Sequence, residues 1–451
     1  MTPGLPLARR ELAPLIARCN RCGACTAVCP LYAVTKDEGA AARGKLALTG
    51  ALLEGALSPG PGSAEVLNSC LLCGSCAGSC ASGVPAPDVI LAARREFSTA
   101  RSYPPALRFF LREVLPRPRL TGGAGTFLGA LAFFLRKAGG RSLAGFLAGE
   151  NPLARRLPAY VREAVRAFGC LPAPGGTDPF PDHQAGAPVP GTARKTAGYF
   201  TGCAARLFLP RLGRATRHAL WVAGISTAAP RNFCCGMPQL AAGDLAAARE
   251  LAKKNIDLFL SMSPDLVVTD CASCGAMLKG YARLFAGDPG YAEKAAAFAA
   301  KVKDVSEVLA EALLQEGPGA FPRTGRREKI RVTYHDPCHL ARGQGIRLPP
   351  RRLLKDVLGV ELVEMERPDA CCGGGGTFFL TRPDLAAGVG EAKAADILAT
   401  GADLVVTACP GCLVYLTLAL QKKKERSVPV LHLAELLAGW FSLGSPFPAG
   451  R

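Results

Sequence analysis

The sequence has no apolar run long enough to cross a lipid bilayer, which takes about 18 to 20 residues of helix. The longest candidate extends from Gly125 to Leu135 and stops at Arg136 and Lys137, so we expect no membrane span. The start of the chain also lacks an apolar segment followed by a small-residue cleavage site. We therefore expect a cytoplasmic protein, with peripheral attachment to the inner face of the cell membrane as the alternative.

Short motifs that hold nucleotides or haem are missing as well. The sequence has no G-x-G-x-x-G motif, no Walker A motif and no C-x2-C-H haem motif. The glycine run 373–376 lacks the Walker lysine, so we interpret it as a loop that closes over a metal centre and not as a phosphate cradle. We therefore expect no flavin on this chain and assign any hydride chemistry to a partner subunit.

Cysteine, by contrast, is abundant, with 19 in 451 residues. Because the cytosol keeps thiols reduced, cysteines at C-x2-C spacing there indicate metal or cluster ligands and not disulfides. All but one fall into four ordered groups; Cys170 is left over, and we interpret it as a small buried apolar residue. The length, with 49% hydrophobic residues, is ample for two or three packed domains.

Two compact groups near the N-terminus share the spacing C-x2-C-x2-C-x3-C, which wraps a tight loop around an iron–sulfur cubane. In two-cluster ferredoxins the fourth cysteine of such a run ligates the other cluster. Carried over here, one cubane takes Cys19, Cys22, Cys25 and Cys80, and the other takes Cys70, Cys73, Cys76 and Cys29. Zinc knuckles are the alternative, but no histidine lies in residues 1–100. The unit resembles the bacterial two-[4Fe-4S] ferredoxin domain, with Ala81 where that domain usually has a second proline.

Two long groups follow, each with a lone cysteine, an adjacent cysteine pair before a glycine, and a C-x2-C pair. Five convergent thiols exceed what one tetrahedral zinc ion needs, so a larger cluster is the better interpretation. The glycines, Gly236 and Gly373, let the backbone turn sharply and bring N–H groups toward the sulfurs. The groups are Cys203, Cys234, Cys235, Cys271 and Cys274, and Cys338, Cys371, Cys372, Cys409 and Cys412.

These two groups belong to an internal repeat with an offset of 135 to 138 residues. The segments DLVVTDCASC and DLVVTACPGC are nearly identical, and each places a β-branched strand before its C-x2-C pair. Amphipathic helices are expected at 241–260 and 384–398, ahead of those strands. Strand and helix alternation predicts parallel sheets, whose ligands gather at the carboxyl ends of the strands.

The formal charge of +18 is concentrated between Arg94 and Arg166, where 14 Arg and Lys face four Glu. This stretch has no recognisable nucleic-acid module, so we expect no nucleic-acid partner. Because it also holds apolar clusters, it favours a docking surface for an acidic partner or anionic lipid. A solvated helical linker is the alternative.

The predicted fold class is an α-rich or α+β ferredoxin-type N-terminal domain followed by a C-terminal α/β tandem repeat with parallel sheets. We expect the two-[4Fe-4S] domain at 1–92, a basic helical connector and Pro/Gly-rich linker at 93–195, and repeat units at 196–325 and 326–445.

The long groups resemble the cysteine-rich CCG domain found in heterodisulfide reductases, in the glycolate oxidase iron–sulfur subunit, and in related lactate-utilisation proteins. The domain order, and the stretch CNRCGACTAVCPLY followed by AARGKLAL, are most similar to the glycolate oxidase type. The resemblance implies one or two further noncubane [4Fe-4S] clusters in the CCG domains. In heterodisulfide reductases such clusters cleave a disulfide.

Two histidines flank a cysteine of the second repeat and are the candidates for catalysis. His335 and His339 would tune a cluster by hydrogen bonding to sulfur or take part in proton transfer, and a polar cap on the strand end is the alternative. Asp270 precedes Cys271 as a candidate proton carrier, but its counterpart in the repeat is Ala408.

The leading functional hypothesis is an electron-transfer subunit of a flavin-dependent 2-hydroxyacid dehydrogenase acting on glycolate or D-lactate. A partner flavoprotein would supply the electrons, and quinone, a membrane cytochrome or another acceptor would take them. The alternative is a heterodisulfide-reductase-like catalytic subunit with thiol–disulfide chemistry at a CCG cluster. A structural zinc protein is the third interpretation.

Overall fold

The computed structural model describes residues 7–98, 103–121, 123, 158–169, 180, 195–315, 330–423 and 428–443, and the structural statements below concern these residues. The leftover Cys170 and the apolar run 125–135 lie outside them, as does most of the predicted Pro/Gly-rich linker.

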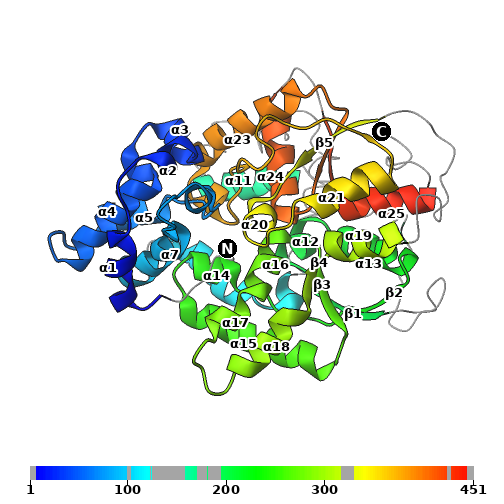
Figure 1. Ribbon diagram of the computed structural model, residues 1–451, viewed down its shortest axis with the longest axis horizontal. Helices are drawn as coiled ribbons and strands as arrows, with labels where there is room; N and C mark the ends of the chain where they lie inside the picture. The colour runs from blue at the N-terminus through cyan, green and yellow to red at the C-terminus, as the bar shows by residue number, and fades with distance from the viewer. Residues whose placement is uncertain are drawn as a thin grey trace.

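Residues 7–98 form a unit of short helices, drawn in blue in Figure 1, and no strand lies among them. The helix expected between the two cysteine runs is α4, and the unit ends with the longer α7. Its elements are α1 (Arg9–Ala17), α2 (Ala24–Ala27), α3 (Pro30–Thr35), η1 (Glu38–Ala40), α4 (Ala42–Leu53), α5 (Pro61–Asn68), α6 (Ser75–Gly78) and α7 (Ala86–Phe97).

The described part of the basic connector is helical. One of its helices, α11, packs against the second repeat. Arginines of the connector also bind within the chain, since the Arg112 guanidinium lies 2.8 Å from the Asp244 carboxylate. The elements are α8 (Pro105–Phe109), η3 (Phe110–Val114) and α11 (Ala159–Gly169).

The first repeat is a four-stranded sheet with the order β2-β1-β3-β4, in which every strand pair is parallel. The expected amphipathic helix is α15. The elements are β1 (Lys195–Tyr199), α12 (Cys203–Phe208), α13 (Leu212–Val222), β2 (Ile225–Ala228), α14 (Met237–Ala241), α15 (Leu245–Ser261), β3 (Leu266–Thr269), α16 (Ala272–Lys279), α17 (Tyr281–Leu284), α18 (Ala292–Lys301), β4 (Val302–Asp304) and α19 (Val305–Gln315).

The second repeat has the same topology, β6-β5-β7-β8, again with parallel pairs throughout. The expected helix is α23, so both helix predictions and the parallel-sheet prediction are confirmed. The elements are β5 (Arg331–His335), α20 (Cys338–Ala341), α21 (Leu348–Arg352), η4 (Leu353–Val357), β6 (Glu361–Leu362), α22 (Phe378–Thr381), α23 (Pro383–Ala399), β7 (Leu404–Thr407), α24 (Pro410–Gln421), β8 (Val430–His432) and α25 (Leu433–Leu443).

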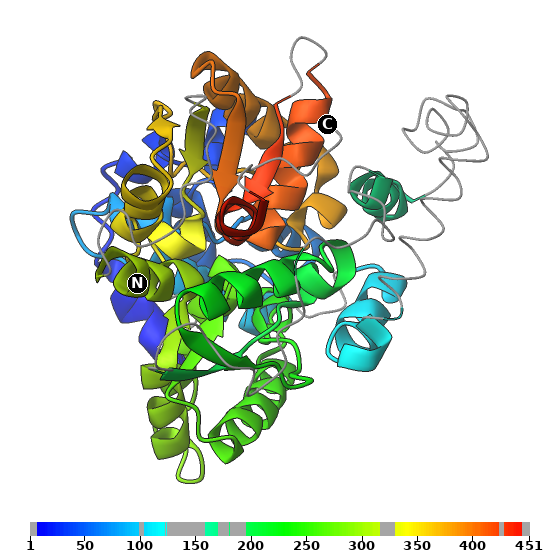
Figure 2. The ribbon, with the colours of Figure 1, turned by 90° about the vertical axis from the view of Figure 1, so that its right-hand side faces the viewer.

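The two repeats exchange their last helices. Helix α25 of the second repeat packs on α13 of the first, and α19 of the first packs on α21 and η4 of the second (Figures 1 and 2). His218, on α13, lies 2.6 Å from the Ser442 hydroxyl of α25, which gives this histidine a structural role. The exchange makes the repeats one body, with the carboxyl ends of their central strands facing each other.

One apolar core runs through both repeats and reaches the N-terminal unit. Leu31, Leu72 and Ile90 of that unit are buried in it together with the strand residues of the repeats. Helix α3 packs on α23 so closely that a Cβ at Gly388 would lie 2.7 Å from the Val34 side chain. The cysteine runs are therefore held against the second repeat.

Candidate metal centres

The cysteines of the repeats lie at the carboxyl ends of the central strands, as the repeat pattern predicts. Cys203 and Cys338 are the first residues of α12 and α20, and Cys271 and Cys409 are the N-caps of α16 and α24. The partial positive charge at a helix N-terminus stabilises a thiolate. The fold therefore brings thiols to places where a negative sulfur is tolerated.

A left-handed glycine follows each cysteine pair. The φ angles of Gly236 and Gly373 are 91° and 97°, and a Cβ at Gly373 would lie 2.8 Å from the Ala386 carbonyl oxygen. The turn lets backbone N–H groups donate to the sulfurs, that of Gly236 to Cys234 among them. The role predicted for both glycines is confirmed.

The ten cysteines of the repeats form one continuous line of thiol contacts. The line crosses between the repeats at Cys271 and Cys409, which are equivalent positions. At Cys371 it branches to Cys73 of the N-terminal unit. The line runs Cys203–Cys234–Cys235–Cys274–Cys271 in the first repeat and Cys409–Cys412–Cys372–Cys371–Cys338 in the second.

Hydrogen bonds and burial divide these thiols into two kinds. Thiols that donate to a neighbouring sulfur have raised pKa values, as for Cys203 toward Cys234, and burial adds to the effect. Hydrogen bonds from the Cys234 and Cys274 thiols lower the pKa of Cys235 to about 5, and those from Cys371 and Cys412 lower that of Cys372. A buried set of thiolates needs positive charge, and thiolate-rich sites select iron–sulfur clusters, zinc or copper(I).

The N-terminal cysteines are brought together across the two runs. Burial raises the pKa of Cys29, and the nearby Cys70 and Cys73 thiols add to the rise. Burial also raises the pKa of Cys76, and Cys70, Cys73 and Cys29 contribute to that rise. The fourth cysteine of the first run therefore lies with the second run, while Cys80 packs with Cys19 against another apolar cluster.

His339 joins three parts of the molecule. Its Nε2 lies 3.3 Å from the Leu72 carbonyl oxygen of the N-terminal unit, and its Nδ1 lies 2.9 Å from the Ser273 hydroxyl of the first repeat. A carbonyl can only accept, so Nε2 carries the proton and the Ser273 hydroxyl donates to Nδ1. Burial lowers the His339 pKa, which keeps this bridge neutral.

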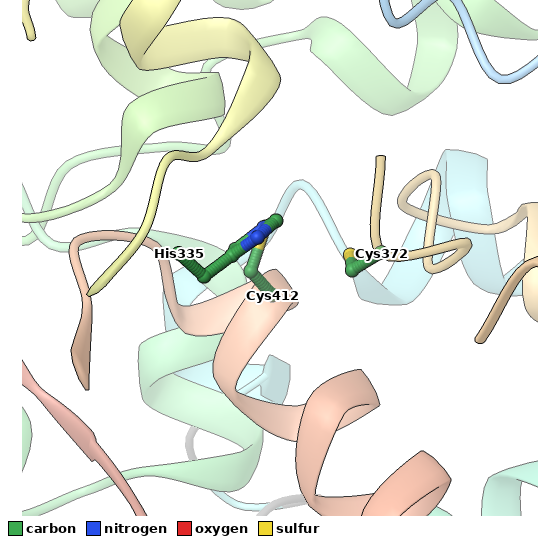
Figure 3. A group of neighbouring side chains, drawn as sticks. All are labelled: His335, Cys372 and Cys412. Carbon is green, nitrogen blue, oxygen red and sulfur yellow. The ribbon is translucent and has the colours of Figure 1, made fainter. Parts of the chain in front are cut away.

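His335 has no such partners. It is fully buried, and neither ring nitrogen has a hydrogen-bond partner within the described residues. One nitrogen lies within 4.8 Å of the Cys372 and Cys412 sulfurs (Figure 3). Burial lowers the His335 pKa to about 3, and the Lys393 ammonium adds to the shift. The imidazole is therefore neutral and directed at the second sulfur set.

Asp270 is part of a buried network between the repeats. One of its carboxylate oxygens accepts hydrogen bonds from the Tyr199 hydroxyl at 2.5 Å and the Thr216 hydroxyl at 2.8 Å. Its carbonyl accepts a 2.8 Å hydrogen bond from His432 Nε2 of the second repeat. Asp270 therefore anchors the segment that leads into Cys271.

Two buried cations near the second cysteine run were missed by the sequence analysis. The Arg94 guanidinium donates to the carbonyls of Cys70 and Ala241, and thus ties the N-terminal unit to the first repeat. The Lys45 ammonium donates to the Gly39 and Ala40 carbonyls, and Cys70 and Cys29 lie close enough to oppose the lowering of its pKa by burial. No spacing or periodicity distinguishes either residue from surface charges.

Comparison with known families agrees with this architecture. The cysteine-rich CCG domain matches residues 197–279 and 332–417, and the 4Fe-4S dicluster domain matches residues 16–84. The chain is therefore an iron–sulfur protein with a dicluster domain and two CCG domains.

Whole-chain similarity narrows the family. The chain is 32% identical over 437 residues to the probable glycolate oxidase iron–sulfur subunit of Bacillus subtilis, a match that covers 94% of this chain and 93% of that protein. It belongs to the family of that subunit, as the sequence resemblance predicted.

Two further relatives match over half of the chain. Lactate utilization protein A of Shouchella clausii is 34% identical over 239 residues, which cover 53% of this chain and 96% of that protein. A fumarate reductase (CoM/CoB) polypeptide from Methanothermobacter marburgensis is 35% identical over 243 residues, which cover 53% of this chain and 45% of that protein. No helix in the described part of the chain is long and apolar enough to span a membrane.

Proposed function

We propose that this chain is the electron-transfer subunit of a flavin-dependent 2-hydroxyacid dehydrogenase that oxidises glycolate or D-lactate. A separate flavoprotein would remove electrons from the hydroxyacid, and this chain would pass them to a quinone or another acceptor. The observation that carries the proposal is the unbroken line of thiols from the N-terminal unit through the second repeat to the first. The names of the two bacterial relatives favour glycolate or lactate as the substrate.

We assign the ligands from the clustering of the thiols. The position of Cys29 beside Cys70 and Cys73 supports an exchange of the fourth cysteine between the two runs. Bound iron–sulfur clusters supply one-electron transfer between thiolate-ligated irons. One cubane would take Cys19, Cys22, Cys25 and Cys80, the second would take Cys29, Cys70, Cys73 and Cys76, and each CCG unit would hold a further cluster with its own five cysteines.

The residues around the sulfurs fit this role. The burial of eight of the CCG cysteines excludes water, and the N–H groups of helix starts and of the glycine turns stabilise thiolates. Cys22 is exposed, which offers the first cubane as the point where a partner delivers electrons. Lys45 and Arg94 place positive charge beside the second cysteine run and would compensate part of the charge of its cluster.

The test is anaerobic purification of the native complex with and without Cys22→Ser. We expect a co-purifying flavoprotein and hydroxyacid-driven reduction of an artificial acceptor, and we expect the substitution to abolish the acceptor step while the flavin is still reduced. Cys170→Ser is the matched control and should leave electron flow unchanged. Unaltered electron flow in Cys22→Ser, with the cubane lost, would contradict the proposal.

A second candidate function is thiol–disulfide chemistry at the second CCG unit. It is favoured by a cavity of about 180 Å³ that is lined by Cys73, Cys338 and His339, together with Asp88 and Arg342. Reduction of a disulfide by the isolated chain with an artificial donor would support this function. Inertness toward a panel of disulfides, by a chain whose clusters are intact, would exclude it.

A further inference from the structure

The internal repeat places two different side chains at one position. Tyr199 pairs with Val268 in the first sheet and Tyr334 pairs with Val406 in the second, so the next residues, Phe200 and His335, are equivalent. Both are fully buried. The two CCG units thus share a fold and a cysteine set but differ in one aromatic side chain at the end of the first strand.

In the first unit this position is apolar. The Phe200 ring packs 5.8 Å from the Phe259 ring and has no group to offer a sulfur. In the second unit the imidazole lies within 4.8 Å of the Cys372 and Cys412 sulfurs, and neither nitrogen has a partner among the described residues (Figure 3). A buried polar group without a partner is costly, so such a group generally has one in the functional state.

We propose that His335 donates an N–H hydrogen bond to a sulfur of the second CCG centre and makes its reduction potential higher than that of the first. The proposal rests on the proposed function only in that the second unit holds an iron–sulfur cluster. Five thiols already serve as ligands in that unit, which leaves the imidazole as a hydrogen-bond donor. The buried ring is neutral, and a neutral imidazole carries one N–H.

The physical reason for the higher potential is charge. Reduction adds an electron to a cluster that is already rich in thiolate charge, and a hydrogen bond to sulfur stabilises the reduced form more than the oxidised form. The second unit is also the one whose Cys371 touches Cys73 of the N-terminal unit. Electrons that leave the cubanes would therefore reach the higher-potential CCG centre first and rest there.

The experiment uses the full chain, reconstituted anaerobically, with iron and sulfide measured for every variant. Redox titration followed by electron paramagnetic resonance gives the potential of each centre. We expect His335→Phe, which installs the residue of the first unit, to make reduction of the second centre about tenfold less favourable, a shift of about 59 mV for one electron. His335→Gln keeps an N–H donor and should recover part of the shift.

The reciprocal substitution and the wild type guard against a variant that fails to fold. Phe200→His should raise the potential of the first centre and leave the second unchanged. Pulsed resonance on wild-type protein with ¹⁵N-labelled histidine should detect a weak nitrogen coupling to the reduced second centre. Absence of that coupling, or an unchanged potential in a fully loaded His335→Phe, would overturn the proposal. A strong coupling with loss of iron in His335→Phe would also overturn it, because His335 would then be a direct ligand.

The outcome is separable from that of the proposed function. A shifted potential in a chain that has no flavoprotein partner would support the role of His335 and contradict the dehydrogenase assignment. An unshifted potential in a chain that hydroxyacid reduces through a flavoprotein would do the reverse.

Discussion

The two CCG repeats have one scaffold and two interiors. Both have the strand order of a four-stranded parallel sheet, five cysteines, and a left-handed glycine after the cysteine pair. Their buried polar groups differ, because Asp270 and Asp304 of the first repeat correspond to Ala408 and His432 of the second. Duplication has therefore kept the residues that position the sulfurs and changed those that surround them.

The largest expected effect separates the repeats by their neighbours. Cys371 contacts Cys338 and Cys372 and also Cys73, whereas the thiol partners of the equivalent Cys234 belong to its own repeat. Cys371→Ser should remove the second CCG centre and perturb the spectrum of the adjacent cubane, while Cys234→Ser should remove the first centre alone. Iron analysis with resonance spectra checks both. Identical spectra of the cubanes in the two variants would break the comparison.

The next effect is a pH dependence that belongs to the first repeat. Burial raises the pKa of Asp304 to about 7, with a smaller rise from Glu307 and an opposing effect of Lys279. The raised pKa means that stability is full below the ordinary carboxyl pKa and falls as the pH rises through 7, by as much as about 4 kcal/mol.

Asp304→Asn removes this titration, so its melting temperature should fall less than that of the wild type between pH 5 and pH 8. The position holds His432 in the second repeat, and the Ser306 hydroxyl and N–H that bind Asp304 can also bind an amide oxygen. Equal slopes of melting temperature against pH in the two proteins would contradict the assignment.

A smaller effect is expected where the repeats meet. His432→Leu leaves the Asp270 carbonyl and the Ala434 N–H without their partners, at a cost of about 1–3 kcal/mol in the free energy of unfolding. Chemical denaturation of the loaded protein measures it. His432→Gln, which can still donate to the carbonyl, is the matched control, and a leucine variant as stable as the glutamine variant would show that His432 does not stabilise the interface.

The smallest effect is expected at exposed ion pairs that hold the other parts to the repeats. Arg112 of the connector pairs with Asp244 of the first repeat, and Arg382 of the second repeat pairs with Glu65. Since each pair has an exposed partner, Arg112→Ala and Arg382→Ala should each change the free energy of unfolding by less than about 1 kcal/mol. Losses several times larger in the same denaturation experiment would show that these pairs, and not the apolar core, hold the units together.

The strands and their cysteines could be predicted from the sequence because the signal is local. The segment LVVT before each C-x2-C pair is β-branched and apolar, and the repeat shows it twice. The exchange of α19 and α25 could not be predicted, because an amphipathic helix does not specify which of two similar repeats it packs on.

The contacts of single polar residues were harder still. His339 was a candidate because it follows Cys338, but its bridge to Leu72 and Ser273 depends on how three units pack. Arg94 belongs to a basic stretch in the sequence and is nevertheless buried, which only its carbonyl partners explain.

The most direct test of the electron-transfer role is rapid mixing of the anaerobic native complex with glycolate or D-lactate, followed at flavin and cluster wavelengths. We predict bleaching of the flavin and then of the iron–sulfur absorbance of this chain within a catalytic turnover. Flavin bleaching with no change in the clusters, in a complex whose clusters dithionite still reduces, would contradict that role.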